Sequence, residues 1–162
     1  QHMEEAHVSP YVLLSLKYYY NVDGSVPNDH FLTVARILKK VAAGDGEFSP
    51  KEREAFFALY VAAGATDDVL DQFDAIDVAT VDLDAELEEM KGDHEIALRH
   101  LIFASTAISA ADGFHKKERA LVEKVGHYLR VKQNVIDGII AGTLRENEGR
   151  QQRLKFMGNQ HF

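Results

Sequence analysis

Carboxylate side chains recur at matched positions beside two Asp-Gly turns of this sequence. They are Asp45 and Glu52 at the first turn, and Asp112 and Glu118 at the second. Carboxylate oxygens grouped around a tight glycine turn are the ligands that hard divalent cations prefer in proteins. The repeated placement therefore makes these four acids candidate ligands of a divalent cation.

Helix capping explains part of the same pattern. The glycines after Asp45 and Asp112 can adopt the left-handed conformation that ends a helix. Ser49 and Glu52 have the Ser-x-x-Glu spacing of a capping box. An acid at a helix C-terminus, however, faces the negative end of the helix dipole and costs up to about 1 kcal/mol. Both turns keep that acid, which favours a shared function in addition to capping.

The elements that must position these acids are helices in a repeated order. Residues 38–60 and residues 105–128 share an apolar helical segment, an Asp-Gly turn, a phenylalanine and a charged cluster that opens another helix. Apolar positions before the turn match at an offset of 67 residues, and those after it at an offset of 66. This repetition predicts a duplicated supersecondary unit.

The apolar periodicity is helical nearly throughout the chain. It predicts an all-α fold of about eight helices, arranged as two four-helix repeats related by internal duplication. The expected helices lie near 9–23, 28–43, 49–63, 66–74, 83–91, 94–110, 116–129 and 132–146, with a connector at 76–82. The expected domains are a tag remnant and flexible N-terminus at 1–8, one helical domain at 9–147 (repeats at about 9–76 and 77–147) and a frayed basic tail at 148–162.

Composition limits the classes of function. The chain has 162 residues, 46% hydrophobic residues and no cysteine, which excludes disulfides and thiolate metal sites. No apolar run approaches the roughly 20 residues that span a bilayer, and no signal peptide is evident. We therefore expect a cytoplasmic protein with no membrane insertion.

The net charge of −8 is distributed unevenly. Residues 66–95 contain twelve acids and one base, so this segment carries −11 and the rest of the chain +3. An acidic segment disfavours nucleic acid and suits cations or basic partners. Solvated helix faces and acidic first turns are the simpler explanation for most of these acids.

The two helix–turn–helix segments resemble the TerB-like family, which is associated with tellurite resistance. The shared pattern is an apolar helix, Ala-Asp-Gly, a hydrophobic residue and a glutamate early in the next helix. The resemblance implies two four-helix repeats and a divalent metal held by Asp45, Glu52, Asp112 and Glu118, with Glu47 as a fifth donor of weaker support. Two departures from symmetry are the shorter Asp-to-Glu spacing in the second copy and Gly-Asp-Gly in the first.

Other metal sites fit the sequence less well. An EF-hand counted from Asp45 would place Phe56 where a bidentate glutamate is required. The histidines lack zinc-site spacing, and the Glu-x-x-His pairs of a di-iron bundle are absent from the predicted core. His115 borders the second turn and is expected to be an exposed loop residue.

We therefore expect a non-enzymatic, TerB-like protein that binds divalent cations, calcium or magnesium first and zinc as an alternative, in tellurite resistance or a stress response. The alternative is an adaptor whose acidic segment or aromatic first helix contacts a protein partner, either basic or membrane-associated. An unrecognised hydrolase or metalloenzyme is the third hypothesis. The oligomeric state is left open.

Overall fold

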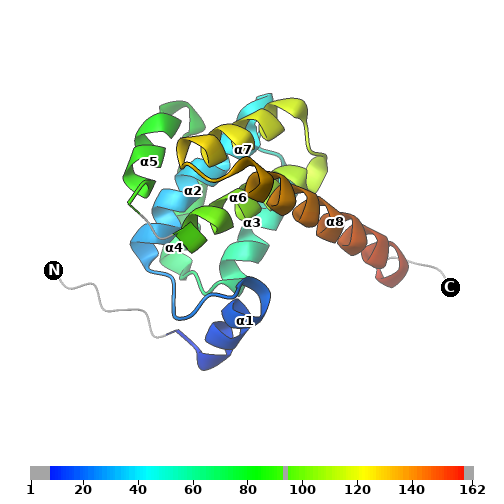
Figure 1. Ribbon diagram of the computed structural model, residues 1–162. Coiled ribbons are helices and arrows are strands. Elements are labelled where there is room, and N and C mark those ends of the chain that lie inside the picture. The colour runs from blue at the N-terminus through cyan, green and yellow to red at the C-terminus, as the bar shows by residue number, and fades with distance from the viewer. Residues whose placement is uncertain (1–7, 93–94, 159–162) are drawn as a thin grey trace.

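Eight α-helices and three short 3-10 helices make up the described part of the chain, with no strand in it (Figure 1). This computed structural model describes residues 8–92 and 95–158, and for Asp45, Glu95 and Ile96 it describes the backbone alone. The elements are α1 Pro10–Tyr20, α2 Asn28–Ala42, η1 Ala43–Asp45, α3 Pro50–Ala62, α4 Asp67–Asp74, η2 Val78–Thr80, α5 Leu83–Met90, α6 Glu95–Ser109, η3 Ala110–Asp112, α7 Lys116–Tyr128 and α8 Gln133–Met157. The predicted all-α class is confirmed.

Helices α2 and α6 form the centre of the fold and pack against each other. The predicted apolar stripe of α2 is buried, with Ile37, Leu38 and Val41 all at 0% exposure. Helix α6 contributes Ile102 and Ile108, also at 0% exposure. Helices α3, α4, α5, α7 and α8 each pack against one or both of them, in keeping with the i, i+3, i+4 spacing of apolar residues.

The segment α2–η1–α3 matches the segment α6–η3–α7 in length as well as order. Each consists of a 15-residue helix, a three-residue 3-10 turn and a 13-residue helix. The flanking helices do not match, since α4 has 8 residues and α8 has 25. The correspondence is therefore closest around the two acidic turns.

Each acidic turn packs against a helix of the other segment. The turn η1 contacts α7, and η3 contacts α3. The first contact is close, because a Cβ added at Gly44 would lie 2.5 Å from Cδ1 of Leu121. This reciprocal packing brings the first turns of α3 and α7, which carry Glu52 and Glu118, toward the same region of the interior.

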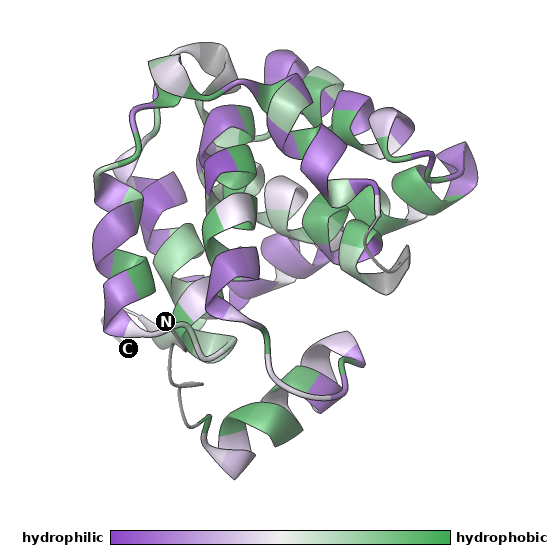
Figure 2. Ribbon diagram, turned by 90° about the vertical axis from the view of Figure 1, so that its left-hand side faces the viewer, coloured by the Kyte–Doolittle hydropathy of each residue, from purple (hydrophilic) through white to green (hydrophobic). Residues whose placement is uncertain are grey.

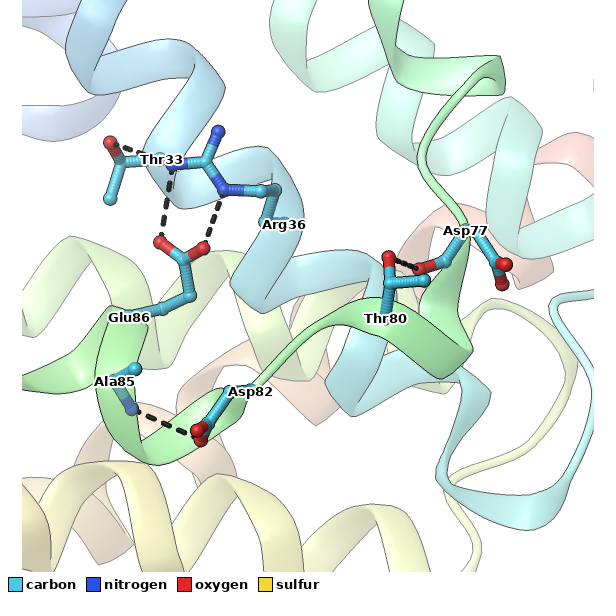
Figure 3. Close-up of polar contacts among 7 residues, drawn as sticks. All are labelled: Thr33, Arg36, Asp77, Thr80, Asp82, Ala85 and Glu86. Carbon is cyan, nitrogen blue, oxygen red and sulfur yellow. Dashed lines mark hydrogen bonds and ion pairs between the residues drawn. The ribbon is translucent and has the colours of Figure 1, made fainter.

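Side-chain contacts hold the connector at 76–82 and the neighbouring helix α5 in place (Figure 3). Asp77 caps η2, and the Asp82 carboxylate accepts a hydrogen bond from the amide of Ala85 at 3.2 Å. Arg36 on α2 donates two hydrogen bonds to Glu86 on α5, at 2.7 and 3.2 Å. The connector expected at 76–82 therefore contains the 3-10 turn η2, and it is stabilised by side chains within it and on both sides of it.

Some predicted boundaries were wrong. Helix α1 ends at Tyr20 rather than near Asp23, because Asn21 adopts the left-handed conformation (φ 53°) and caps it. Helix α8 continues to Met157, so the tail expected to be frayed is helical as far as that residue. Thr66 precedes α4 as predicted, but its side chain makes no capping bond. None of the described helices has the length and apolarity needed to cross a membrane.

Candidate metal centre

Glu52 is placed by the start of α3. Pro50 occupies the first turn of this helix, where a missing amide costs nothing. The Ser49 hydroxyl accepts a hydrogen bond from the Glu52 amide at 3.1 Å, and Oε1 of Glu52 accepts one from the Ser49 amide at 2.8 Å. The predicted capping box is confirmed, and it fixes the direction of the Glu52 carboxyl.

Glu118 occupies the corresponding place at the start of α7. Its Oε1 accepts a hydrogen bond from the amide of His115 at 3.0 Å. Asn147 on α8 donates to the carbonyl of Ala110 at 3.1 Å and so ties down the adjoining turn η3. The second glutamate is therefore held by the same main-chain contact as the first.

The two glutamates meet inside the protein, and both have 0% exposure. Burial raises the pKa of Glu52 to about 8, against the opposing effect of the Ser49 amide. The adjoining Glu118 carboxyl and the charges of Asp112 and Glu118 contribute to the same rise in pKa. Without a cation, the pair therefore retains a proton near neutral pH.

Asp112 and His115 complete the centre. One ligand atom from each of Asp112, His115 and Glu118 lies within 4.8 Å of the other two. Oδ1 of Asp112 and Oε2 of Glu52 are buried and have no hydrogen-bond partner among the described residues. Buried carboxylate oxygens without donors are the feature that a bound cation would satisfy.

The structure brings together three of the five acids expected from the sequence: Glu52, Asp112 and Glu118. The backbone of Asp45 closes η1, and its side chain lies outside the described part. Glu47 has an exposed side chain and does not belong to the cluster of ligand atoms found among the described residues.

His115 was missed as a member of this cluster. The sequence favoured an exposed loop role, and the side chain is indeed exposed, yet it lies beside the two acids. The spacing Asp112-x-x-His115-x-x-Glu118 was the available signal. A turn at Gly113, with φ 108° and ψ 133°, followed by the first turn of α7 brings residues at this spacing together.

The arrangement offers oxygen donors from two helices and one imidazole nitrogen at an accessible edge. Carboxylates accept hydrogen bonds and bind cations, whereas a neutral imidazole nitrogen suits borderline ions such as zinc more than calcium. These features define an all-helical protein with a buried carboxylate centre that joins two matched helix–turn–helix segments.

Comparison with known proteins agrees with the all-helical fold. Residues 31–139 match the family described as tellurite resistance protein TerB. This chain therefore belongs to the TerB family. Its fold is similar to the crystal structure of a tellurite resistance protein from Nostoc punctiforme, with a TM-score of 0.72 and 21% identity over 95% of this chain and 98% of that chain. No curated protein matches the chain.

Proposed function

We propose that the protein binds a divalent cation at the centre formed by Glu52, Asp112, His115 and Glu118. The observation that carries this proposal is the meeting of two fully buried glutamates from two different helices. Each uses one oxygen to cap its own helix, and Oε2 of Glu52 has no donor within the described residues. Capping alone does not require the two carboxyls to face each other.

The energetics support a cation in this position. Burying an ionised carboxylate without a partner costs several kcal/mol. Two carboxyls that face each other reduce that cost by retaining a proton, which raises the pKa of one of them. A divalent cation would replace the proton and neutralise both charges, so binding is expected to release a proton and to strengthen as pH rises.

The reciprocal packing of the two turns suggests how the centre arose. We propose that α2–η1–α3 and α6–η3–α7 descend from one duplicated unit. Their matched lengths and the two glutamates at equivalent helix starts support this origin. In this proposal each copy supplies one carboxyl, and neither copy alone forms the centre.

The family name suggests the biological setting. Because the matching family is described by tellurite resistance, we propose that cation binding serves tellurite resistance or a related stress response. The role is one of binding, with no catalytic step assigned to these residues.

The acidic segment at 66–95 gives the adaptor hypothesis less support than the buried glutamates give cation binding. Many acids of residues 66–95 already have partners within the chain. These are Asp74 with Arg53, Asp77 and Asp82 as caps, Asp84 with Lys124, Glu86 with Arg36, and Glu88 with Lys91 and Tyr128. A basic partner would have to compete with these internal contacts.

Titration of metal-stripped protein with magnesium, calcium and zinc ions tests the proposal. Calorimetry should detect saturable binding of at least one ion, and NMR shifts should centre on the first turns of α3 and α7. Asp112→Asn and Glu118→Gln should each weaken binding by about tenfold or more. Glu123→Gln is the matched control, because Glu123 lies on the same helix and pairs with Arg119 at 3.9 Å.

The variants also separate the candidate ions. His115→Ala should weaken zinc binding more than magnesium binding, because imidazole is a poor ligand for hard cations. Saturable binding that survives both Asp112→Asn and Glu118→Gln would place the ion elsewhere. The absence of heat and of NMR shifts with all three ions would reject cation binding.

A further inference from the structure

A second feature of the molecule, separate from the carboxylate centre, is an apolar cavity beneath α1. Its volume is about 430 Å³, within the range of small-molecule sites. Helices α1, α2, α3 and α6 and the loop after α1 supply its walls. Most of the wall is aliphatic or aromatic, including Leu16, Val26, Phe31, Leu38, Leu101 and Phe103.

The polar side chains of the wall are largely engaged with the protein itself. The Tyr60 hydroxyl donates to the carbonyl of Phe31 at 2.7 Å, and Nε2 of His100 lies 2.8 Å from the carbonyl of Tyr20. Asp23 pairs with Lys17 at 3.1 Å. A ligand would gain little from these groups, so the chemistry of the wall selects for an apolar body.

Helix α1 forms the cover of this cavity. It lies at the lower edge of the molecule in both ribbon views and contacts α3 (Figures 1 and 2). Leu16 is 2% exposed, and the ring of Tyr20 packs on Phe103 at 5.4 Å between centroids. The loop that follows includes Gly24 at φ 88°. One short helix, α1, thus closes one side of the cavity, and the other walls belong to α2, α3 and α6.

We infer that this cavity binds a small, uncharged, apolar molecule of alkyl or aryl character. The walls offer dispersion contacts and remove apolar surface from water, which is the main driving force for such binding. An anionic ligand is disfavoured by the net charge of −8 and by the largely exposed Asp23 at the wall. The cavity shares no lining residue with the carboxylate centre, so the inference does not depend on the proposed function.

A second groove of similar size supplies a contrast. It measures about 460 Å³ and lies between α3, α6 and α8, with an alanine-rich floor and charged residues such as Lys51, Glu54 and Arg150 among its lining. Ala104 and Ala107 stand one turn apart on α6, the first lining the apolar cavity and the second lining this groove. Leu59 and Phe103 line both sites, but Ala104 lines only the cavity and Ala107 only the groove, so the same substitution at these two positions reduces one site or the other.

Titration with decanol, followed by amide NMR shifts, tests the inference. Saturable shifts are expected for residues of α1, α2 and α6 that line the cavity. Ala104→Leu should weaken decanol binding by about tenfold or more, since 1.4 kcal/mol corresponds to tenfold in affinity. Ala107→Leu should leave it unchanged. Ala97→Leu, a second substitution in the cavity wall, gives an independent test if the first variant folds poorly.

Each outcome bears on the inference. Binding that is lost in the two cavity variants and kept in Ala107→Leu supports it. Decanoate should bind more weakly than decanol, and equal binding would overturn the assignment to uncharged ligands. Absence of saturable shifts with decanol, or shifts that persist in both cavity variants, would overturn the site itself. Metal titrations of the same variants should be unchanged in every case.

Discussion

The loop after η1 (46–49) is one residue longer than the loop after η3 (113–115), yet each is followed by a helix that carries a buried glutamate in its first turn. The distance from the capped amide to Oε1 is 2.8 Å for Glu52 and 3.0 Å for Glu118. The backbone conformation of the glycines differs with the loop length. Gly46 has φ 106° and ψ −11°, whereas Gly113 has φ 108° and ψ 133°. The position of the carboxyl is thus kept while the backbone path changes.

The same two turns differ in how closely they pack. At the first turn, Gly44 leaves room for Leu121 of α7, whose Cδ1 would be 2.5 Å from an added Cβ. The equivalent positions at the second turn are Ala111 and Ala55, and both line the groove beside α8. The Gly-Asp-Gly departure seen in the sequence therefore has a steric cause. The larger partner at the first turn lies closest to the smaller turn residue, and an alanine there would displace the Leu121 side chain.

The largest expected effect concerns the pair of carboxyls that the two turns bring together. Glu52 has a folded-state pKa of about 8, above its unfolded value, so the folded protein holds a proton that the unfolded chain has released. The contribution of this pair to metal-free stability should be largest below the unfolded pKa and fall as pH rises toward 8, with a slope of about 1.4 kcal/mol per pH unit for one proton. Urea unfolding across this range measures the slope.

Glu52→Gln should flatten this pH dependence, because the amide keeps the capping oxygen and removes the titration. Glu118→Gln should flatten it similarly, since two interacting carboxyls titrate as a unit. Glu123→Gln is the half-buried control on the same helix and should leave the slope unchanged. Parallel stability curves for the wild type and Glu52→Gln would mean that the two turns do not form a coupled pair.

The next effect concerns the glycines. Gly113→Ala should cost about 2–3 kcal/mol, because its dihedral angles lie in a region almost restricted to glycine. Gly46→Ala should cost about 1 kcal/mol, since the left-handed helical region is less unfavourable for alanine. A Cβ meets nothing within 4 Å at Gly46 and only an ordinary contact at 3.9 Å at Gly113. The loss of stability measured by chemical denaturation should therefore reflect backbone strain alone. Equal losses for the two variants would contradict the view that the two glycines differ in backbone strain.

The smallest effect concerns the caps. Ser49→Ala removes the hydroxyl that accepts from the Glu52 amide and should destabilise the protein by about 1 kcal/mol. His115→Ala keeps the backbone amide that donates to Glu118, so its effect on stability should stay within about 0.5 kcal/mol. Thermal unfolding of both metal-free variants makes the comparison. A larger loss for His115→Ala would assign its side chain a structural role at the second turn.

Periodicity predicted most of the helices because the apolar positions follow one face for three or more turns. The stripe of α2 and the start of α3 at Ser49-Pro50 are as expected. The end of α8 was not predicted, since its last two turns are wholly exposed, including Leu154, Phe156 and Met157, and so follow no core-facing stripe. Lys39 was also missed. Its amine is nearly buried and donates to the carbonyls of Phe73 and Ile76 at 2.9 Å each, a role that depends on distant chain segments.

The candidate centre was also predicted from the sequence only in part. Local sequence spacing predicted that Glu52 would cap α3, because a capping box involves residues three apart. It predicted the matched acids at the second turn through repetition. The sequence also led us to expect that acids of the two turns would meet around one cation, and Glu52, Asp112 and Glu118 do lie together. It did not predict that both glutamates would be fully buried or that His115 would lie beside Asp112, because exposure and distance depend on how α3 and α7 pack.

By itself, the sequence determined the helices, their caps and the positions of the acids along the chain, because these depend on contacts within one or two turns. Tertiary structure alone decided which acids lose their water and face one another. That decision follows from the packing of η1 on α7 and of η3 on α3, which brings two helix starts together across the core. Burial then raises the pKa of Glu52, an effect that no residue has in isolation.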